Sequence, residues 1–179
     1  MTYNRFGMIL IVIALTLITL PVPAFTEERK PTNQDPLLPL RGIQGVYVVV
    51  EGINIPGEPE LTQTQVKTDV EMRLRSKGIR VLTRKEALGT LGNPFLYVKV
   101  QTMEAFGASL YLYSVEVELR QWASLLQNSD VLTYVPTWST EVMGMTGSAN
   151  VERVVQDAVM GSIDRFAEAY LNANSMGKL

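Results

Sequence analysis

The stretch that decides the fold is Val46–Leu82, which reads VYVVVEGINIPGEPELTQTQVKTDVEMRLRSKGIRVL. It opens with VYVVV at 46–50, a run of β-branched residues that is too short for a helix and predicts a buried strand. It closes with a second short apolar run, IRVL, at 79–82. Because a helical pattern lies between the two runs, the stretch predicts a right-handed βαβ unit with two parallel strands.

The helix inside this stretch is indicated by Val66, Val70 and Leu74, which recur at helical spacing. Thr62 stands before them as the expected N-cap and has a Gln three positions on, which suits a capping box. Gly78 follows the last turn and is the residue type that most readily adopts the left-handed conformation of a C-cap. We therefore expect a helix between Thr62 and Gly78.

Further along, the apolar period changes to two. Leu96–Gln101 and Tyr113–Arg120 both alternate apolar and polar residues, which predicts an antiparallel pair with one buried and one solvated face. The turn-type cluster QNSD at 127–130 precedes another strand, expected over Val131–Met143. Because Pro136 has no backbone donor, that strand should be an edge strand or contain a bulge.

A long apolar stripe over Val151–Leu171 predicts the last helix, whereas Thr83–Asn93 is polar, contains two glycines and predicts a loop. The expected order is β-α-β-β-β-β-α. We predict an α+β fold, an α/β sandwich with one mixed sheet and both helices on one face. The domain should cover residues 42–174, followed by a tail at 175–179.

The first 24 residues have the features of a signal peptide. Arg5 is their only charged residue, Phe6–Leu20 is apolar, and V-P-A ends at Ala24, after which we expect cleavage. The apolar run is shorter than the ~20 residues of a bilayer span. An uncleaved anchor nevertheless remains an open alternative. Residues 25–41 contain three prolines and predict an extended linker.

The composition excludes several classes of chemistry. The chain has 179 residues, with 16 Lys and Arg, 18 Asp and Glu, no Cys and no His. Without Cys it can form no disulfide, thiolate nucleophile or lipidated N-terminal cysteine. Without His it lacks the commonest acid/base group and metal ligand. The charge balance argues against nucleic acid binding, and we expect no cofactor, no metal and no lipid anchor.

Glu116 and Glu118 are the strongest candidates for acid/base chemistry, since they lie two apart on one strand face with Arg120 beside them. Such chemistry needs carboxylates across a desolvating cleft, which an open sheet face does not supply. We therefore expect a solvated face and no catalytic residue. A carboxylate-dependent hydrolase acting on an envelope glycan is the alternative, and it would require a deep pocket holding Glu104, Glu116 or Glu118.

Aromatic side chains gather in the antiparallel half of the chain. They are Tyr111, Tyr113, Trp122, Tyr134 and Trp138. Aromatics in a small sheet usually pack in the core or as cross-strand pairs. In the functional alternative, Tyr111, Trp122 or Trp138 lies exposed at a sheet edge and anchors a protein partner. Strand alternation places Tyr134 and Trp138 on the same side.

Three consecutive stretches, GVYVVVEGINIPGEPE, LTQTQVKTDVEMRLRSKG and IRVLTRKEA, resemble the amino-terminal unit of TolB-amino-terminal-domain-like proteins. That group includes the curli-secretion lipoprotein and the lipoprotein activators of penicillin-binding proteins. SVEVELRQWASLLQNSDVLTYVPTWST resembles the family's hairpin, although its QNSD turn lacks the usual Gly and the chain lacks the lipid-anchoring Cys. The resemblance is architectural and implies a bacterial envelope protein that binds other proteins and is not an enzyme. It transfers no functional residue.

These observations lead to the expectation of an exported protein, periplasmic or extracellular, that acts by contact with a protein partner. Exposed sheet edges would offer strand addition as the binding mode. A membrane-tethered structural protein that retains its amino-terminal segment remains the other alternative. The identity of the partner and the oligomeric state do not follow from the sequence.

Overall fold

The computed structural model describes residues 35–53, 61–105 and 109–175, which belong to one compact unit, Asp35–Leu179. The expected signal peptide, its cleavage site at Ala24 and residues 25–34 of the expected linker lie outside the described residues. The unit begins before the expected start at residue 42, because Leu38–Leu40 forms a 3-10 helix (η1) and Leu40 is fully buried in the core.

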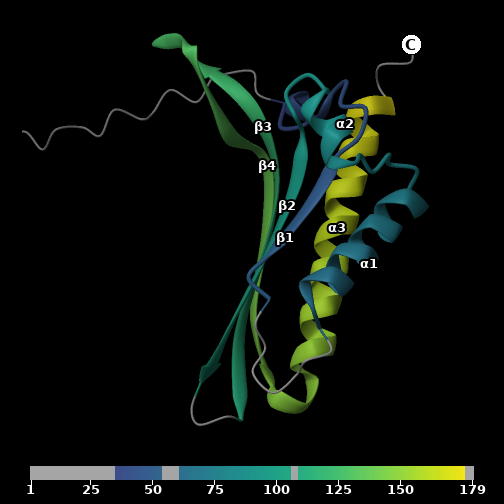
Figure 1. The fold of residues 1–179 in the computed structure, drawn as a ribbon. Helices are drawn as coiled ribbons and strands as arrows, with labels where there is room; N and C mark the ends of the chain where they lie inside the picture. Colours follow the sequence, from purple (N-terminus) through teal and green to yellow (C-terminus); the bar gives the residue numbers. More distant parts are fainter. Residues whose placement is uncertain (1–34, 54–60, 106–108, 176–179) are drawn as a thin grey trace, which may run out of the picture. The chain divides into compact units, whose positions relative to one another are not determined.

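Within the described residues, four strands form one mixed sheet in the order β1-β2-β3-β4. β1 and β2 are parallel, whereas β2–β3 and β3–β4 are antiparallel pairs (Figure 1). This topology confirms the predicted α+β class. The strands are β1 (Tyr47–Glu51), β2 (Phe95–Ala105), β3 (Leu110–Leu125) and β4 (Asn128–Gly147).

Two long helices, α1 (Gln63–Ser76) and α3 (Val151–Ser175), pack together on one face of this sheet, as predicted (Figure 1). Alternate strand residues and the apolar stripes of both helices form a single core. Burial of one such aliphatic or aromatic side chain contributes about 1.5–3 kcal/mol. Representative core residues with no exposed surface are Val48, Val98, Val117, Val70 and Phe166.

The ends of α1 confirm the predicted N-cap and C-terminal glycine, but the capping box is incomplete because the Gln65 side chain donates to Asp69. The Thr62 hydroxyl accepts a hydrogen bond from the Gln65 backbone N–H at 3.1 Å, and Gly78 has a φ of +80°. Near the end of the helix, the Arg73 guanidinium donates two hydrogen bonds, of 2.9 and 2.6 Å, to the carboxylate of Asp164 on α3. This bidentate pair links the two helices at their exposed surface.

The segment after α1 differs from the prediction. Instead of a strand over 79–82, only Val81 forms a parallel bridge, and its partner is Val46. The chain then enters a short helix, α2 (Arg84–Leu88), where a loop was predicted. Thr83 and Glu86 form a reciprocal capping box, with hydrogen bonds of 3.2 and 2.7 Å. The strand is short because this capping box begins a helix immediately after it.

The β3–β4 hairpin also differs in its turn and in its register. The turn is Leu126–Gln127, so β4 begins at Asn128, inside the predicted turn cluster. Leu119 pairs with Trp138 but Arg120 pairs with Pro136, so a bulge at this point adds one residue to β4. The prediction that Tyr134 and Trp138 share a side was therefore wrong. Both expectations for Pro136 are confirmed, because β4 is an edge strand and has the bulge.

Candidate protein interface

The face of the sheet opposite α1 and α3, here called the open face, ends in an aromatic patch formed by Phe95, Trp122 and Tyr134. The ring of Tyr134 lies 5.0 Å from that of Phe95 and 5.5 Å from that of Trp122, measured between centroids. The side-chain amide of Asn93 donates a hydrogen bond to the Tyr134 hydroxyl. Trp122 remains 46% exposed, so this is a fixed cluster of rings with a large free surface.

Beyond this patch, β3 and β4 continue as a two-stranded hairpin arm, Gln121–Pro136. Phe95, the first residue of β2, pairs with Arg120, so β2 supplies no ladder partner to the arm. The arm keeps one further backbone hydrogen bond, from the Trp122 N–H to the Gly92 carbonyl, at 2.8 Å. Figure 1 shows the end of the hairpin projecting from the sheet.

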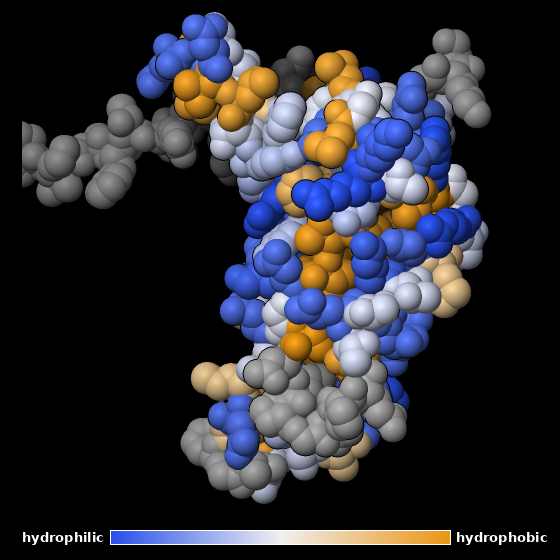
Figure 2. Space-filling view, in the orientation of Figure 1, coloured by the Kyte–Doolittle hydropathy of each residue, from blue (hydrophilic) through white to orange (hydrophobic). Residues whose placement is uncertain are grey.

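The arm is apolar as well as exposed. Its single charged residue is Asp130. Figure 2 shows hydrophobic residues gathered next to hydrophilic ones at the projecting end. An isolated two-stranded hairpin has no core in which to bury such side chains, and a contiguous exposed apolar surface marks an interaction site. The exposed apolar residues of the arm are Trp122, Leu125, Leu126, Val131, Leu132 and Tyr134.

The structure places the three anchors proposed from the sequence in different environments. Trp122 is exposed on the arm, whereas Tyr111 is only 6% exposed and belongs to the core. Trp138 is partly buried, with its ring 5.3 Å from that of Phe166 on α3. The aliphatic residues of the arm were missed in the sequence analysis. The near absence of charge on both sides of the turn was the sequence feature that could have identified them.

The carboxylates considered for catalysis take part in an ionic and aromatic network on the open face. Glu118 is only 8% exposed, so the expectation of a solvated face was wrong for this residue. Its carboxylate accepts a hydrogen bond from the Arg120 Nε at 2.5 Å. The Arg120 guanidinium lies 4.0 Å above the Tyr97 ring, and the Tyr97 hydroxyl donates to Glu51 at 2.6 Å. Long neighbouring side chains therefore bury Glu118 without any covering helix.

Glu116 is half-buried beside this network. Burial raises its pKa, and the neighbouring Glu118 carboxylate raises it further, while Lys99 opposes the shift. Glu104 does not join the other two acids, because it alternates to the opposite face of β2 and lies across from Tyr111. The network stabilises charge on the sheet surface. It does not line a cavity, because the concavities at the root of the arm, beside the aromatic patch and at the other end of the open face are lined by other residues.

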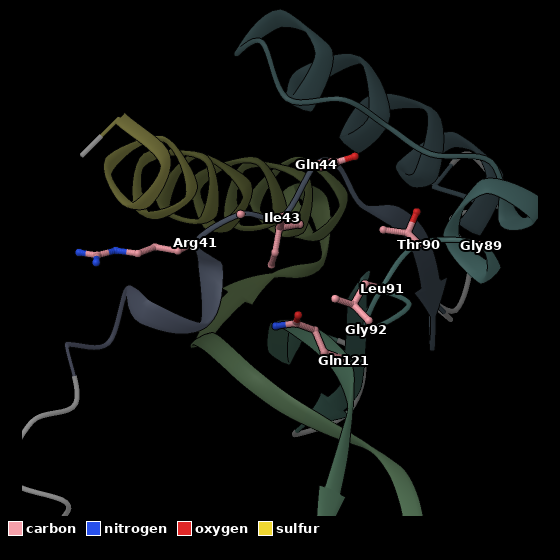
Figure 3. Close-up of a pocket in the computed structure, with 9 residues that line it drawn as sticks. Arg41, Ile43, Gln44, Gly89, Thr90, Leu91, Gly92 and Gln121 are labelled. Atoms are coloured by element: carbon pink, nitrogen blue, oxygen red, sulfur yellow. The ribbon is translucent and has the colours of Figure 1, made fainter. Parts of the chain in front are cut away.

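A concavity of about 420 Å³ lies at the root of the arm, between residues 41–44, residues 89–92 and Gln121 (Figure 3). The Gln121 side-chain amide donates to the Thr137 hydroxyl at 2.7 Å and to the Pro39 carbonyl at 3.1 Å. In Figure 3 the Arg41 side chain extends away from the other lining residues. With its side-chain amide committed to these bonds, Gln121 anchors the arm to the chain that precedes β1.

A smaller hollow, of about 180 Å³, adjoins the aromatic patch. Tyr47, Leu88, Phe95 and Tyr134 line it together with other residues, and Leu88 of α2 is itself exposed. The hollow extends the apolar surface from the arm towards α2. A third concavity lies at the other end of the open face.

In residues 35–53, 61–105 and 109–175, no group of three Asp or Glu residues is arranged to hold a metal ion. No helix in them has both the length and the apolar character needed to cross a membrane.

The fold and candidate site thus define an α+β domain with an exposed apolar hairpin. No protein-family model and no curated protein matches the chain. Among solved structures, the chain is similar to a PelC variant, a dodecamer from Paraburkholderia phytofirmans, with 17% identity over 69% of this chain and 90% of that chain. The TM-score is 0.43, which is a loose likeness of architecture.

Proposed function

We propose that the chain is an exported bacterial envelope protein that binds a protein partner and acts as a non-catalytic accessory domain. The hairpin arm and the aromatic patch form the binding surface. The observation that carries this proposal is the exposure of apolar side chains along a 16-residue hairpin, Gln121–Pro136, with one charged residue.

The export part of the proposal rests on the amino-terminal pattern, where one Arg precedes an apolar run and a small-residue cleavage site at Ala24. The envelope part rests on the sequence resemblance to TolB-amino-terminal-domain-like proteins. Amino-terminal sequencing of the mature protein tests cleavage. A chain that begins at Phe25 is expected, and a chain that retains Phe6–Leu20 would instead support the anchored alternative.

The energetics of the arm suit protein recognition. Trp122 and Leu126 are the two most useful anchors, because a partner pocket that removes either from water gains about 1.5–3 kcal/mol. Tryptophan is enriched among the residues that dominate binding energy, and Trp122 is already held by its contact with Tyr134. A fixed ring loses little side-chain entropy on binding, which favours affinity.

Site-specific photo-crosslinking in cells tests this proposal. A photoreactive amino acid is placed at Leu126 or Leu132 on the arm and, as the matched control, at Met72, an exposed apolar residue of α1. We expect the arm positions to capture one defined protein that Met72 does not capture. Capture of the same products at all three positions, or of none at the arm, would contradict the proposal.

A further inference from the structure

The second half of β4, Ser139–Gly147, is a free sheet edge. Among the described residues β4 pairs only with β3, so one row of its backbone donors and acceptors faces away from the sheet. Exposed and half-buried residues alternate from Ser139 to Thr146, as expected for an edge strand with one side against the core. Such an edge is a template for an added strand.

The side chains next to this edge carry excess negative charge. The strand register aligns one residue from each strand in a row across the open face, Glu51, Lys99, Glu116 and Glu141. This row contains three carboxylates and one ammonium group. Arg120 is bound to Glu118, and Arg165 of α3 donates to the hydroxyl of Thr140, which alternates to the other face of β4. Glu116 and Glu141 face each other directly, which is an unfavourable cross-strand pairing of like charges. A cation from outside the chain would relieve it.

An apolar surface adjoins this acidic row. Met103, Leu112, Met143 and Met145 are all exposed. Three of them, Met103, Leu112 and Met143, line a concavity of about 400 Å³. Met143 follows Glu141 by two residues on β4, so the two side chains lie on the same face of the strand. Methionine adapts its shape to different guests and is common at binding surfaces.

We propose that the Ser139–Gly147 edge binds an extended segment of a partner protein, which adds to the sheet as a further strand. The segment carries a Lys or Arg next to Glu141 and, two residues along, an apolar side chain next to Met143. The two-residue period of a strand matches this spacing, while the edge supplies backbone hydrogen bonds. Pro136 and the bulge limit the addition to this half of β4.

Charge complementarity decides between this occupant and a second copy of the chain. Two copies that paired through β4 near Glu141 would bring their acidic rows together, which opposes association. A basic segment meets the opposite charge instead. This inference rests on the proposed function in that both require a protein partner, but it uses a surface separate from the hairpin arm.

Peptide binding to the purified domain tests the inference. The probe is a short fluorescent peptide with alternating Lys and Val on one face and Thr on the other, and the control peptide has Glu in place of Lys. Fluorescence anisotropy should show a Kd below about 1 mM for the Lys peptide and binding at least about tenfold weaker for the Glu peptide. Glu141→Lys should reverse this preference and Glu141→Gln should weaken it, whereas Trp122→Ala on the arm should leave it unchanged.

Equal binding of the two peptides, or an unchanged preference in Glu141→Lys, would overturn the inference. Sedimentation analysis supplies a second test, because a dimer of the natural chain that Glu141→Lys abolishes would identify a second copy as the occupant and overturn it too. The photo-crosslinks at Leu126 are measured in the same variants. If these crosslinks persist while peptide selectivity is absent, the edge proposal fails and the proposed function stands.

Discussion

The two faces of the sheet are made by alternate residues of the same strands, yet they differ in almost every physical property. On the face covered by α1 and α3, Val98, Val117 and Leu119 have no exposed surface. On the open face their neighbours include Glu116, Glu118 and Arg120, with apolar groups at both ends. The comparison indicates that the covered face supplies most of the folding free energy, while the open face is available for binding.

The largest expected effect is on the free energy of unfolding, and it distinguishes the covered face from the open face. Phe166→Ala removes a fully buried ring beneath Trp138 and Tyr170, and should lower the free energy of unfolding by about 3–5 kcal/mol. The matched control, Leu112→Ala on the open face, should cost less than about 1 kcal/mol, because Leu112 is already exposed. Denaturant unfolding measures both. Similar losses in the two variants would mean that the covered face does not supply most of the folding free energy.

A pair of Gly→Ala substitutions gives the next largest effects, with opposite signs. A Cβ at Gly144 would lie 2.5–2.8 Å from atoms of the Tyr113 ring, so Gly144→Ala should destabilise by about 1–3 kcal/mol. Gly161 of α3 is exposed, and a Cβ added to it would meet no other atom within 4 Å. Gly161→Ala should therefore stabilise the protein by about 0.5–1 kcal/mol. Thermal unfolding of both variants checks the signs. A neutral Gly144→Ala would show that the Tyr113 contact does not constrain β4.

Glu86 provides a carboxylate to compare with those of the open face. Hydrogen bonds from Thr83 and then Arg80 lower its pKa from 4.5 to about 2. The ionised capping box therefore stabilises the fold above pH 4.5, and this contribution is lost as the pH falls towards 2. Glu86→Gln should lower the thermal midpoint at pH 6 and make its decline between pH 4.5 and pH 3 shallower. A parallel pH profile in the two proteins would exclude this role.

The smallest effect is expected at Glu116, whose pKa shift has the opposite direction to that of Glu86. Its pKa is raised by burial and by Glu118, so the folded state binds a proton more readily than the unfolded chain. Stability should decrease as the pH rises from 4.5 through the folded-state pKa. Glu116→Gln should raise the thermal midpoint slightly at pH 7 and leave it unchanged at pH 4. A lower midpoint at pH 7 would show that the Glu116 charge is well compensated.

The covered face was predictable because its signals are local and periodic. The β-branched run at 46–50, the stripe of α1 and the Thr62 cap each follow from neighbouring residues. The capping box of Thr83 and Glu86 was equally local, and its T-x-x-E pattern was missed. By contrast, the bulge that separates Tyr134 from Trp138 depends on how two distant strands align. No periodicity within a single strand reveals such a shift.

The open face was harder to predict because its properties come from neighbours on other strands. The position of Glu118 in the alternating pattern predicts a solvated side chain, yet Arg120 and the Tyr97 ring shield it from water. The exposure of the arm follows from the start of β2 at Phe95, about thirty residues earlier in the chain. Sequence patterns therefore predicted which residues form the core more reliably than which apolar residues stay outside it.

The most direct test of the central claim measures binding and stability in one variant. Leu126→Ser combined with Leu132→Ser removes two exposed aliphatic side chains of the arm, with a photoreactive residue at Val131 reporting on the partner and Met72→Ser as the control. We predict a loss of partner crosslinking of at least about tenfold with an unchanged thermal midpoint. Crosslinking at the natural level in a folded variant would contradict the assignment of the hairpin arm as the binding surface.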